Sequence, residues 1–325
     1  MQPFIDAGLS VHVAQAGRFK LSEATCSGAA KGAIVAPDIA TQEGDRLMAA
    51  TKQLTEAGTS KYVTVDGVKV HYNEAGTGDP VVMIHGGGPG ASGWSNYGTN
   101  IGPLSERFRV ILMDMPGFGK SDSVVIPGGR AAFNAKILSG MLKQLDIPKA
   151  NLIGNSMGGA TSAKTAIDYP DQVNKVVLMG AAGGGVSYFV PGPPEGIKLL
   201  NEVFNNPTRE GLEKMIRVFV YDSSFMTPEL LEQRYRATVD NQDHLEARKK
   251  SSPGIEDLTG EIHKIKAKTL LIWGRDDRFV PLDHGLSFLW RIPDAQLHVY
   301  SKCGHWAQYE KSDEFNRLVT DFLTH

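Results

Sequence analysis

The sequence is poor in cysteine, lacks a long hydrophobic run and has no excess of charge of one sign. Its 325 residues include only Cys26 and Cys303, which indicates neither a disulfide framework nor a metal site and makes a reducing cytoplasm the expected location. No stretch approaches the roughly 20 consecutive apolar residues that a membrane helix requires. Lysine and arginine number 34 and aspartate and glutamate 36, so nothing indicates binding to nucleic acid or to an anionic membrane.

The first 47 residues lack a hydrophobic period. Their apolar residues are scattered at neither the helical nor the strand spacing. No continuous apolar segment follows a basic start, as a secretory signal would require, and the acidic residues present argue against a transit peptide. We expect residues 1–47 to be an unstructured and dispensable extension.

From about residue 60 onward, short apolar runs alternate with amphipathic segments of helical length. Such runs are typical of buried parallel strands, and the alternation predicts the α/β class, with a mostly parallel sheet covered by helices. Residues 186–262 interrupt the pattern with prolines and helical segments, which predicts a helical lid between two parts of the core, 48–185 and 263–325. The predicted strands are Val68–Tyr72, Val81–Ile84, Val110–Met113, Leu152–Ile153, Val176–Met179, Thr269–Trp273 and Leu297–Tyr300.

The segment Gly154–Gly158 has the pattern G-x-S-x-G directly after an apolar strand and directly before a helix. A sharp strand-to-helix turn strains its central residue and needs small neighbours, which the glycines supply. Without this placement, the motif would equally fit a glycine-rich turn with a helix-capping serine. The placement favours Ser156 as a nucleophile, with the N–H of Met157 available at the helix start.

A serine nucleophile needs a base, and His305 is the distinctive candidate among nine histidines. It follows the last predicted strand, and Asp277 follows the strand before it, so both are expected at the same sheet edge as Ser156. Asp277 would orient the imidazole of His305. Asp276 is the rival acid, with a turn-capping or surface role as its alternative, and Cys303 is expected to be a small loop residue.

The segment His85–Gly90 contains three successive glycines after a predicted strand. Backbone N–H groups of Gly87 and Gly88 are therefore expected to form an oxyanion hole with the N–H of Met157, although a merely flexible loop is the alternative. Residues 117–121 resemble the end of a phosphate-binding loop, but Asp114 stands where that loop needs its first glycine. No metal-binding motif occurs, so we expect neither a metal nor a cofactor.

Together these motifs resemble the meta-cleavage-product hydrolases of the α/β-hydrolase fold, which cleave a carbon–carbon bond in ring-opened aromatic compounds. The resemblance covers about residue 55 to the end. It implies that Gly87, Gly88, Asn96 and Asn155 contact the dienoate end of the substrate, that Ser224 and Arg234 reach it from the lid, and that Trp306 lines the pocket. It also implies a homo-oligomer. The segments that carry it are HGGGPGASGWSNY (85–97), GNSMGGAT (154–161), WGRDDRFVPLDHG (273–285) and SKCGHWAQ (301–308).

The activity that the resemblance implies is hydrolysis of a 2-hydroxy-6-oxohexa-2,4-dienoate, with the 6-phenyl compound as the expected substrate. Benzoate and 2-hydroxypenta-2,4-dienoate would be its products. A general carboxylesterase of the same fold is the first alternative. A non-catalytic binding protein on this scaffold is the second, but such a protein would not need the complete set Ser156, Asp277 and His305.

Overall fold

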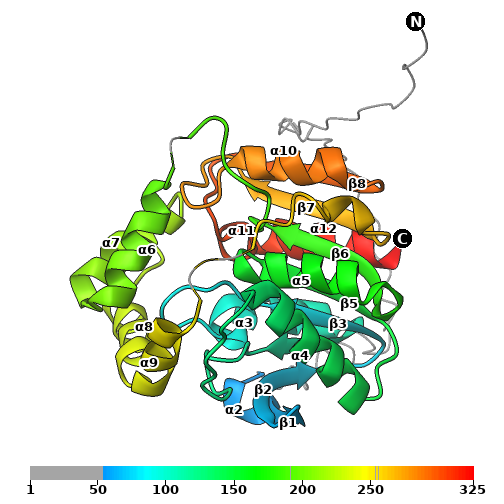
Figure 1. Ribbon diagram of the computed structural model, residues 1–325, viewed down its shortest axis with the longest axis horizontal. Helices are drawn as coiled ribbons and strands as arrows, with labels where there is room; N and C mark the ends of the chain where they lie inside the picture. Colours follow the sequence, from blue (N-terminus) through cyan, green and yellow to red (C-terminus); the bar gives the residue numbers. More distant parts are fainter. Residues whose placement is uncertain (1–53, 191, 253, 255) are drawn as a thin grey trace, which may run out of the picture. The chain divides into compact units, whose positions relative to one another are not determined.

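Short apolar segments form the strands of one 8-stranded sheet (Figure 1). The computed structural model describes residues 54–190, 192–252, 254 and 256–325, so the expected extension 1–47 lies outside the described residues. The strand order is β1-β2-β4-β3-β5-β6-β7-β8, and β2 runs in the direction opposite to all the other strands of this sheet. The strands are β1 (Ser60–Val65), β2 (Val68–Ala75), β3 (Asp79–Ile84), β4 (Phe108–Met113), β5 (Ala150–Asn155), β6 (Val173–Met179), β7 (Lys268–Gly274) and β8 (Ala295–Tyr300).

The central strands are buried on both sides. Every residue of β5 is buried, as are the last four of β3, β4 and β6, which explains their continuous apolar character. α3 (Gly93–Ser105) packs with α11 (Ala307–Glu310) and α12 (Ser312–Thr324), and α4 (Arg130–Gln144) packs with α5 (Met157–Asp168). Helices α10 (Leu282–Arg291) and α2 (Glu56–Thr59) also contact strands. The strand pairing and these helices confirm the expected mostly parallel sheet with flanking helices.

β1 and α3 are among the elements that sequence analysis did not predict. β1 pairs with β2 at the sheet edge, and α3 follows the glycine loop. Glycines at 93, 98 and 102 and Pro103 lower the helix propensity of the α3 segment. A capping box between Ser92 and Ser95 satisfies N–H groups of its first turn and helps the helix to start there.

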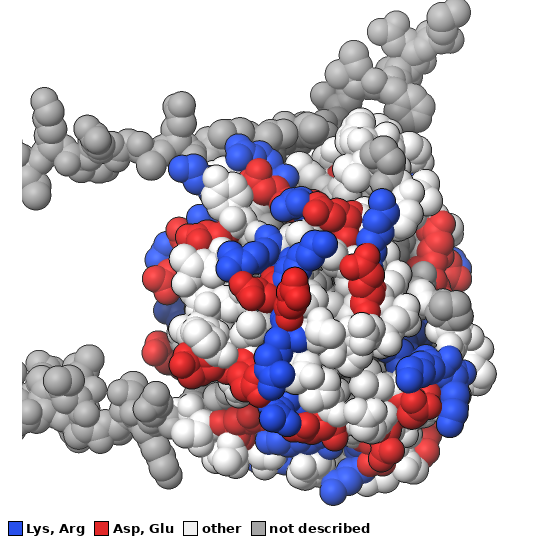
Figure 2. Space-filling view, turned by 90° about the vertical axis from the view of Figure 1, so that its left-hand side faces the viewer, with Lys and Arg blue, Asp and Glu red and all other residues white. Residues whose placement is uncertain are grey.

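Between β6 and β7 the described residues form helices joined by loops, with no strand. The helices are α6 (Glu195–Asn205), α7 (Arg209–Phe219), α8 (Pro228–Val239), α9 (Gln242–Lys250) and the short helix η2 (Ile262–Lys264). Figure 2 faces this side of the described chain and shows Lys and Arg interspersed with Asp and Glu. The lid helices contribute ion pairs to this pattern, because Arg209 and Arg236 both contact Glu232. Across the described residues, no helix is both long and apolar enough for a membrane span.

Candidate active site

Ser156 occupies a strained position between β5 and α5. Its backbone has φ 56° and ψ −116°, a left-handed conformation that a residue with a side chain rarely adopts. The close approach of the chain here requires glycine, because a Cβ on Gly158 would lie 2.1 Å from the carbonyl oxygen of Ile84 and one on Gly154 2.2 Å from that of Gly158. The turn therefore places Ser156, which is 5% exposed, at the carboxyl edge of the sheet.

His305 and Asp277 form a buried hydrogen-bonded pair. Nδ1 of His305 lies 2.8 Å from Oδ2 of Asp277, and Oδ1 of Asp277 accepts hydrogen bonds from the N–H groups of Phe279 and Val280. These bonds fix the carboxylate, which in turn orients the imidazole. Within the described chain, Nε2 of His305 has no hydrogen-bond partner, and His305 lines the same cavity as Ser156. This nitrogen is therefore available to accept a proton.

The neighbouring candidates take other positions. Asp276 faces Arg275, whose Nη2 lies 3.3 Å from its carboxylate, rather than His305. Cys303 is fully buried, and burial raises the pKa of its thiol. A thiol held protonated is a poor nucleophile, so the geometry favours the serine.

The glycine loop lies against the start of α5. A Cβ on Gly86 would lie 3.3 Å from Cβ of Ser156, and one on Gly87 3.2 Å from Sδ of Met157. The His85 ring holds this loop, since Nδ1 bonds to the Gly86 carbonyl oxygen at 2.7 Å and Nε2 accepts the Met115 N–H. Burial lowers the pKa of His85, which suits the neutral form that these two bonds require.

Two buried asparagines, Asn96 and Asn155, link α3, the turn before Ser156 and the loop that carries His305. Nδ2 of Asn96, from α3, lies 3.3 Å from Oδ1 of Asn155. Nδ2 of Asn155 donates to the carbonyl oxygens of Met179 and His305. Because both N–H groups of Asn155 bind protein carbonyls, this side chain holds His305 in place, and only its oxygen remains able to interact further.

A cavity of about 1010 Å³ lies above these residues, between the sheet edge and the lid. Its apolar part includes Phe219, Phe279 and Val280, and the ring centroid of Phe279 is 4.8 Å from that of His305. The expected site residues that line the cavity are Gly87, Gly88, Asn96, Asn155, Ser156, Met157, Arg234, His305 and Trp306.

Ser224 does not take the expected position. It is exposed, its N–H donates to Oδ1 of Asp222 at 2.9 Å, and it is not among the described residues that line the cavity. The expected contact with the dienoate is therefore not supported by its placement. Ser224 lies in the irregular segment between α7 and α8, whose path the sequence pattern did not indicate.

Arg234 extends from α8 to the glycine loop. Its Nη2 is 3.6 Å from where a Cβ on Gly88 would lie, and its guanidinium is 4.9 Å from the ring centroid of Trp306. Burial lowers the pKa of Arg234 to about 10, so it remains a cation at neutral pH. Its Nε is buried and has no hydrogen-bond partner in the described part of the chain. A buried cation with unused donors is suited to bind a carboxylate.

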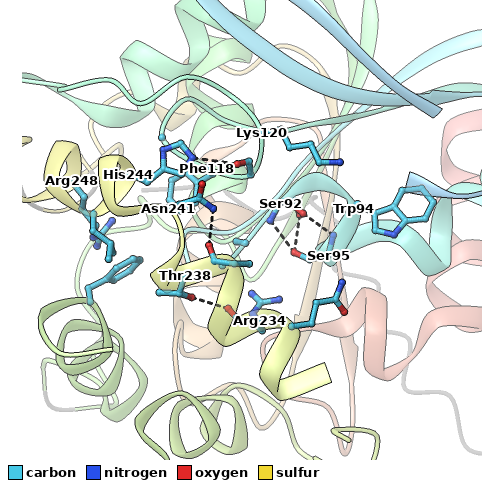
Figure 3. A pocket seen from close by; sticks show the side chains of 18 of the residues that line it. Ser92, Trp94, Ser95, Phe118, Lys120, Arg234, Thr238, Asn241, His244 and Arg248 are labelled. Atoms are coloured by element: carbon cyan, nitrogen blue, oxygen red, sulfur yellow. Dashed lines mark hydrogen bonds between the residues drawn. The ribbon is translucent and has the colours of Figure 1, made fainter. Parts of the chain in front are cut away.

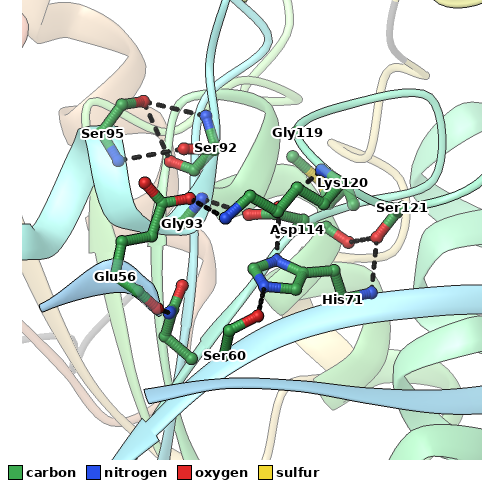
Figure 4. A network of polar contacts seen from close by, with 12 residues as sticks. Glu56, Ser60, His71, Ser92, Gly93, Ser95, Asp114, Gly119, Lys120 and Ser121 are labelled. Atoms are coloured by element: carbon green, nitrogen blue, oxygen red, sulfur yellow. Dashed lines mark hydrogen bonds and ion pairs between the residues drawn. The ribbon is translucent and has the colours of Figure 1, made fainter. Parts of the chain in front are cut away.

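A second polar network fixes the start of α3 (Figure 4). Oδ1 of Asp114 accepts the Gly93 N–H at 2.7 Å, and Oδ2 accepts the Lys120 N–H and lies 2.8 Å from Nδ1 of His71. Burial opposes ionisation of Asp114, but the bond with His71 and the other donors lower its pKa below the usual range. His71 also contacts Ser60, so this network repeats the residue types of the Ser156 site. None of its members lines the larger cavity, and its position indicates a structural role.

We expect Asp114→Ala to destabilise the protein by about 3–5 kcal/mol, because it leaves buried donors of Gly93, Lys120 and His71 without their charged acceptor. Urea unfolding would measure this loss. Asp122→Ala, which removes a more exposed carboxylate that accepts the Lys69 N–H, is the matched control with a smaller expected effect. Equal losses for the two variants would show that the Asp114 network has no special role.

A second cavity of about 430 Å³ adjoins the first beneath α8 and α9 (Figure 3). Figure 3 shows Arg234 and Arg248 on these two helices at its edge. Arg130, Arg248 and Phe204 line both cavities, and sequence analysis singled out none of them. Arg130 is the first residue of α4 and is 6% exposed, which is unusual for arginine at the start of an amphipathic helix. That inward placement has no local sequence signal.

The chain is similar to known hydrolases. Residues 79–312 match the family model described as the alpha/beta hydrolase fold. A 2-hydroxy-6-oxo-6-phenylhexa-2,4-dienoate hydrolase from Comamonas testosteroni is 51% identical over 281 residues, 83% of this chain and 98% of the relative. A 2-hydroxy-6-oxononadienedioate/2-hydroxy-6-oxononatrienedioate hydrolase from Burkholderia vietnamiensis is 50% identical over 279 residues, 83% of this chain and 97% of the relative.

A solved structure shows the same likeness. The meta-cleavage product hydrolase from Pseudomonas fluorescens, an alanine mutant of a serine complexed with acetates, superposes with a TM-score of 0.72 at 35% identity. The match covers 81% of this chain and 97% of that protein. On these grounds the chain belongs to the meta-cleavage-product hydrolases of the α/β-hydrolase fold.

Proposed function

We propose that this hydrolase cleaves the carbon–carbon bond next to the ketone of a 2-hydroxy-6-oxohexa-2,4-dienoate, using Ser156, His305 and Asp277. The observation that carries the proposal is the buried His305–Asp277 pair, with Nε2 of His305 free at the cavity that Ser156 lines. The names of the two relatives reported above support the substrate class. Their shared part is the 2-hydroxy-6-oxo-dienoate chain, and the group on the ketone side differs.

In the proposed reaction, the dienol is first protonated at C5, which gives a keto tautomer able to accept electrons. The Ser156 hydroxyl gives its proton to Nε2 of His305 as the C6 ketone is attacked, and Asp277 stabilises the imidazolium. Backbone N–H groups of Gly87 and Met157 stabilise the oxyanion. Cleavage of the C5–C6 bond and addition of one water then release 2-hydroxypenta-2,4-dienoate and a second carboxylic acid.

Arg234 is the proposed anchor for the C1 carboxylate of the dienoate. It lies beside Gly88, in the loop proposed to form the oxyanion hole. Arg234 would therefore hold the carboxylate at one end of the cavity, and the reacting ketone would lie in the middle. Asn96 and Asn155, whose side chains are bonded to each other, are the other polar groups proposed at this end. Trp306 stacks under the guanidinium and restricts its orientation.

The apolar wall of Phe219, Phe279 and Val280 supports the 6-phenyl compound as one substrate, because a phenyl ring would lose its water there without leaving polar groups unpaired. Such an enzyme acts within cells that degrade aromatic compounds. We place it in the cytoplasm on the scarcity of cysteine, and as a homo-oligomer on the resemblance alone.

A spectrophotometric screen tests the proposal. We expect the yellow absorbance of the 6-phenyl dienolate and of its 6-(2-carboxyethyl) analogue to disappear on addition of the enzyme, with benzoate and succinate as the respective products. p-Nitrophenyl esters should be turned over much more slowly. Fast ester hydrolysis with no loss of either dienolate would instead support the general carboxylesterase.

A further inference from the structure

The described chain contains two kinds of arginine around the lid. On the outer face, Arg236 contacts Glu232 and Arg209 does the same, as is usual for exposed arginines. Arg130 and Arg248 line the larger cavity instead, and neither has an ion pair or a side-chain hydrogen bond to another described residue. Two inward guanidinium groups without such partners require an explanation, because uncompensated charge is costly away from bulk water.

The surroundings of these two arginines supply no carboxylate in direct contact with either guanidinium among the described residues. Burial lowers the pKa of Arg248 to about 10, and the positive charge of Arg130 adds to this shift. Glu256 attracts Arg130, but its carboxylate oxygens accept the N–H groups of Ala131 and Ala132 at the start of α4. The guanidinium of Arg248 lies only 3.6 Å from the ring centroid of Phe204, which fixes its plane. The two guanidinium groups thus line one cavity, and neither forms an ion pair with a described carboxylate.

Helix α6 relates this cationic pair to the reacting end of the cavity. Its N-terminal end packs against Phe279, because a Cβ on Gly196 would meet the ring of Phe279. The ring of Phe279 in turn lies 4.8 Å from that of His305, so Phe279 separates the helix from the histidine. Ile197, Leu200 and Phe204 all line the cavity, at the spacing of one helix face. From Ile197 to Phe204 the helix rises about 10 Å. An apolar face therefore leads from the histidine toward Phe204 and Arg248.

We propose that Arg130 and Arg248 form a second anion-binding position, which takes a carboxylate at the end of the ketone-side substituent. The inference rests on the proposed function and deepens it. Arg234 would hold the C1 carboxylate, the apolar face of α6 would contact the methylene groups, and the arginine pair would bind the distal acid. The preferred substrates are then dicarboxylates, and the 6-phenyl compound is accepted through the apolar wall alone.

The first test needs only the wild-type enzyme. The substrates are 2-hydroxy-6-oxonona-2,4-dienedioate, its homologues one and two carbons longer, and the amide of each at the distal carboxyl, which is neutral but similar in shape. We expect kcat/KM to be about 100-fold higher for the acid than for its amide at the length that fits best, as is typical of a buried charged contact. Equal values for acid and amide at every length would overturn the inference.

The second test locates the effect. Arg248→Met and Arg130→Met should each remove most of the acid-over-amide preference, because the distal carboxylate of the acid loses a cationic partner. The same variants should change kcat/KM for the neutral amides by less than about threefold, because an amide forms no charge contact with the arginine. Arg248→Lys should retain part of the preference because it keeps the charge but loses the planar contact with Phe204. Arg236→Met, on the outer face of α8, is the matched control and should retain the full preference. A preference that survives in both Arg130 and Arg248 variants would also overturn the inference.

The outcome is distinguishable from failure of the proposed function. If none of the dienoates is cleaved, the proposed function fails. Calorimetry then compares the binding of succinate, which has two carboxylates, with that of its monoamide, which has one, and needs no turnover. Tighter binding of succinate that is lost in Arg248→Met would support the second anion position on its own. Equal binding of the two compounds would count against it.

Discussion

Replacing Ser156 or His305 by alanine is expected to lower kcat for the dienoate by about 10⁴- to 10⁶-fold, because the two groups act as a unit in proton transfer. The double variant should be no slower than either single variant, since removing the second group takes away nothing that still works. Steady-state loss of the dienolate absorbance would measure both effects. Wild-type-like turnover in either single variant, with contamination excluded, would refute the assignment of these residues.

The adjacent aspartates provide a matched pair of controls for this prediction. Asp277→Asn should reduce kcat strongly, because an amide at this position changes the tautomer that His305 adopts. Asp276→Asn should leave kcat nearly unchanged, because its carboxylate faces Arg275. Urea midpoints should be compared for all variants, since Asp277 also accepts two backbone N–H groups. The opposite ranking would make Asp276 the acid of the site.

Arg234→Gln is expected to lower kcat/KM for the dienoate by about 2–4 kcal/mol in transition-state stabilisation, as for removal of one partner of a buried charge pair. Lysine at this position should give an intermediate loss, because it keeps the charge but not the two-point geometry of a guanidinium. Arg236→Gln changes the same residue type on the outer side of α8, where it contacts Glu232, and should change kcat/KM by less than about twofold.

A substrate whose C1 carboxylate is esterified separates anchoring from structural support. It offers no anion to Arg234, so its slower hydrolysis should be little affected by Arg234→Gln. Equal losses for acid and ester would mean that Arg234 acts through the lid structure, for example through the packing of its backbone carbonyl against Gly90.

The chemical groups of the site could be predicted from local sequence patterns. The strand, the glycines and the following helix around Ser156 are the local signal for the strained turn, in which Ser156 has φ 56° and a Cβ on Gly158 would lie 2.1 Å from the Ile84 carbonyl oxygen. Apolar runs such as Val81–Ile84 and Val176–Met179 are buried on both sides of the sheet, so every position is apolar and the strand can be predicted from the sequence. The positions of His305 and Asp277 after the last two strands follow from the same rule for parallel sheets.

The tertiary structure decided which side chains face one another and what encloses the site. The sequence could not separate Asp277 from Asp276 by physical reasoning alone, because adjacent residues share the same loop and only the path of the chain turns one toward His305. α3 was not expected, because its glycines and Pro103 lower its local helix propensity. In the folded chain, the capping box and the hydrogen bond from the Gly93 N–H to Asp114 stabilise the start of this helix. Ser224 and Arg248 show the same limit in the lid, where one lies exposed and the other lines the cavity. A single sequence records which groups each segment carries, whereas the meeting of α4, α6 and α9 around a cavity depends on contacts between residues far apart in the chain.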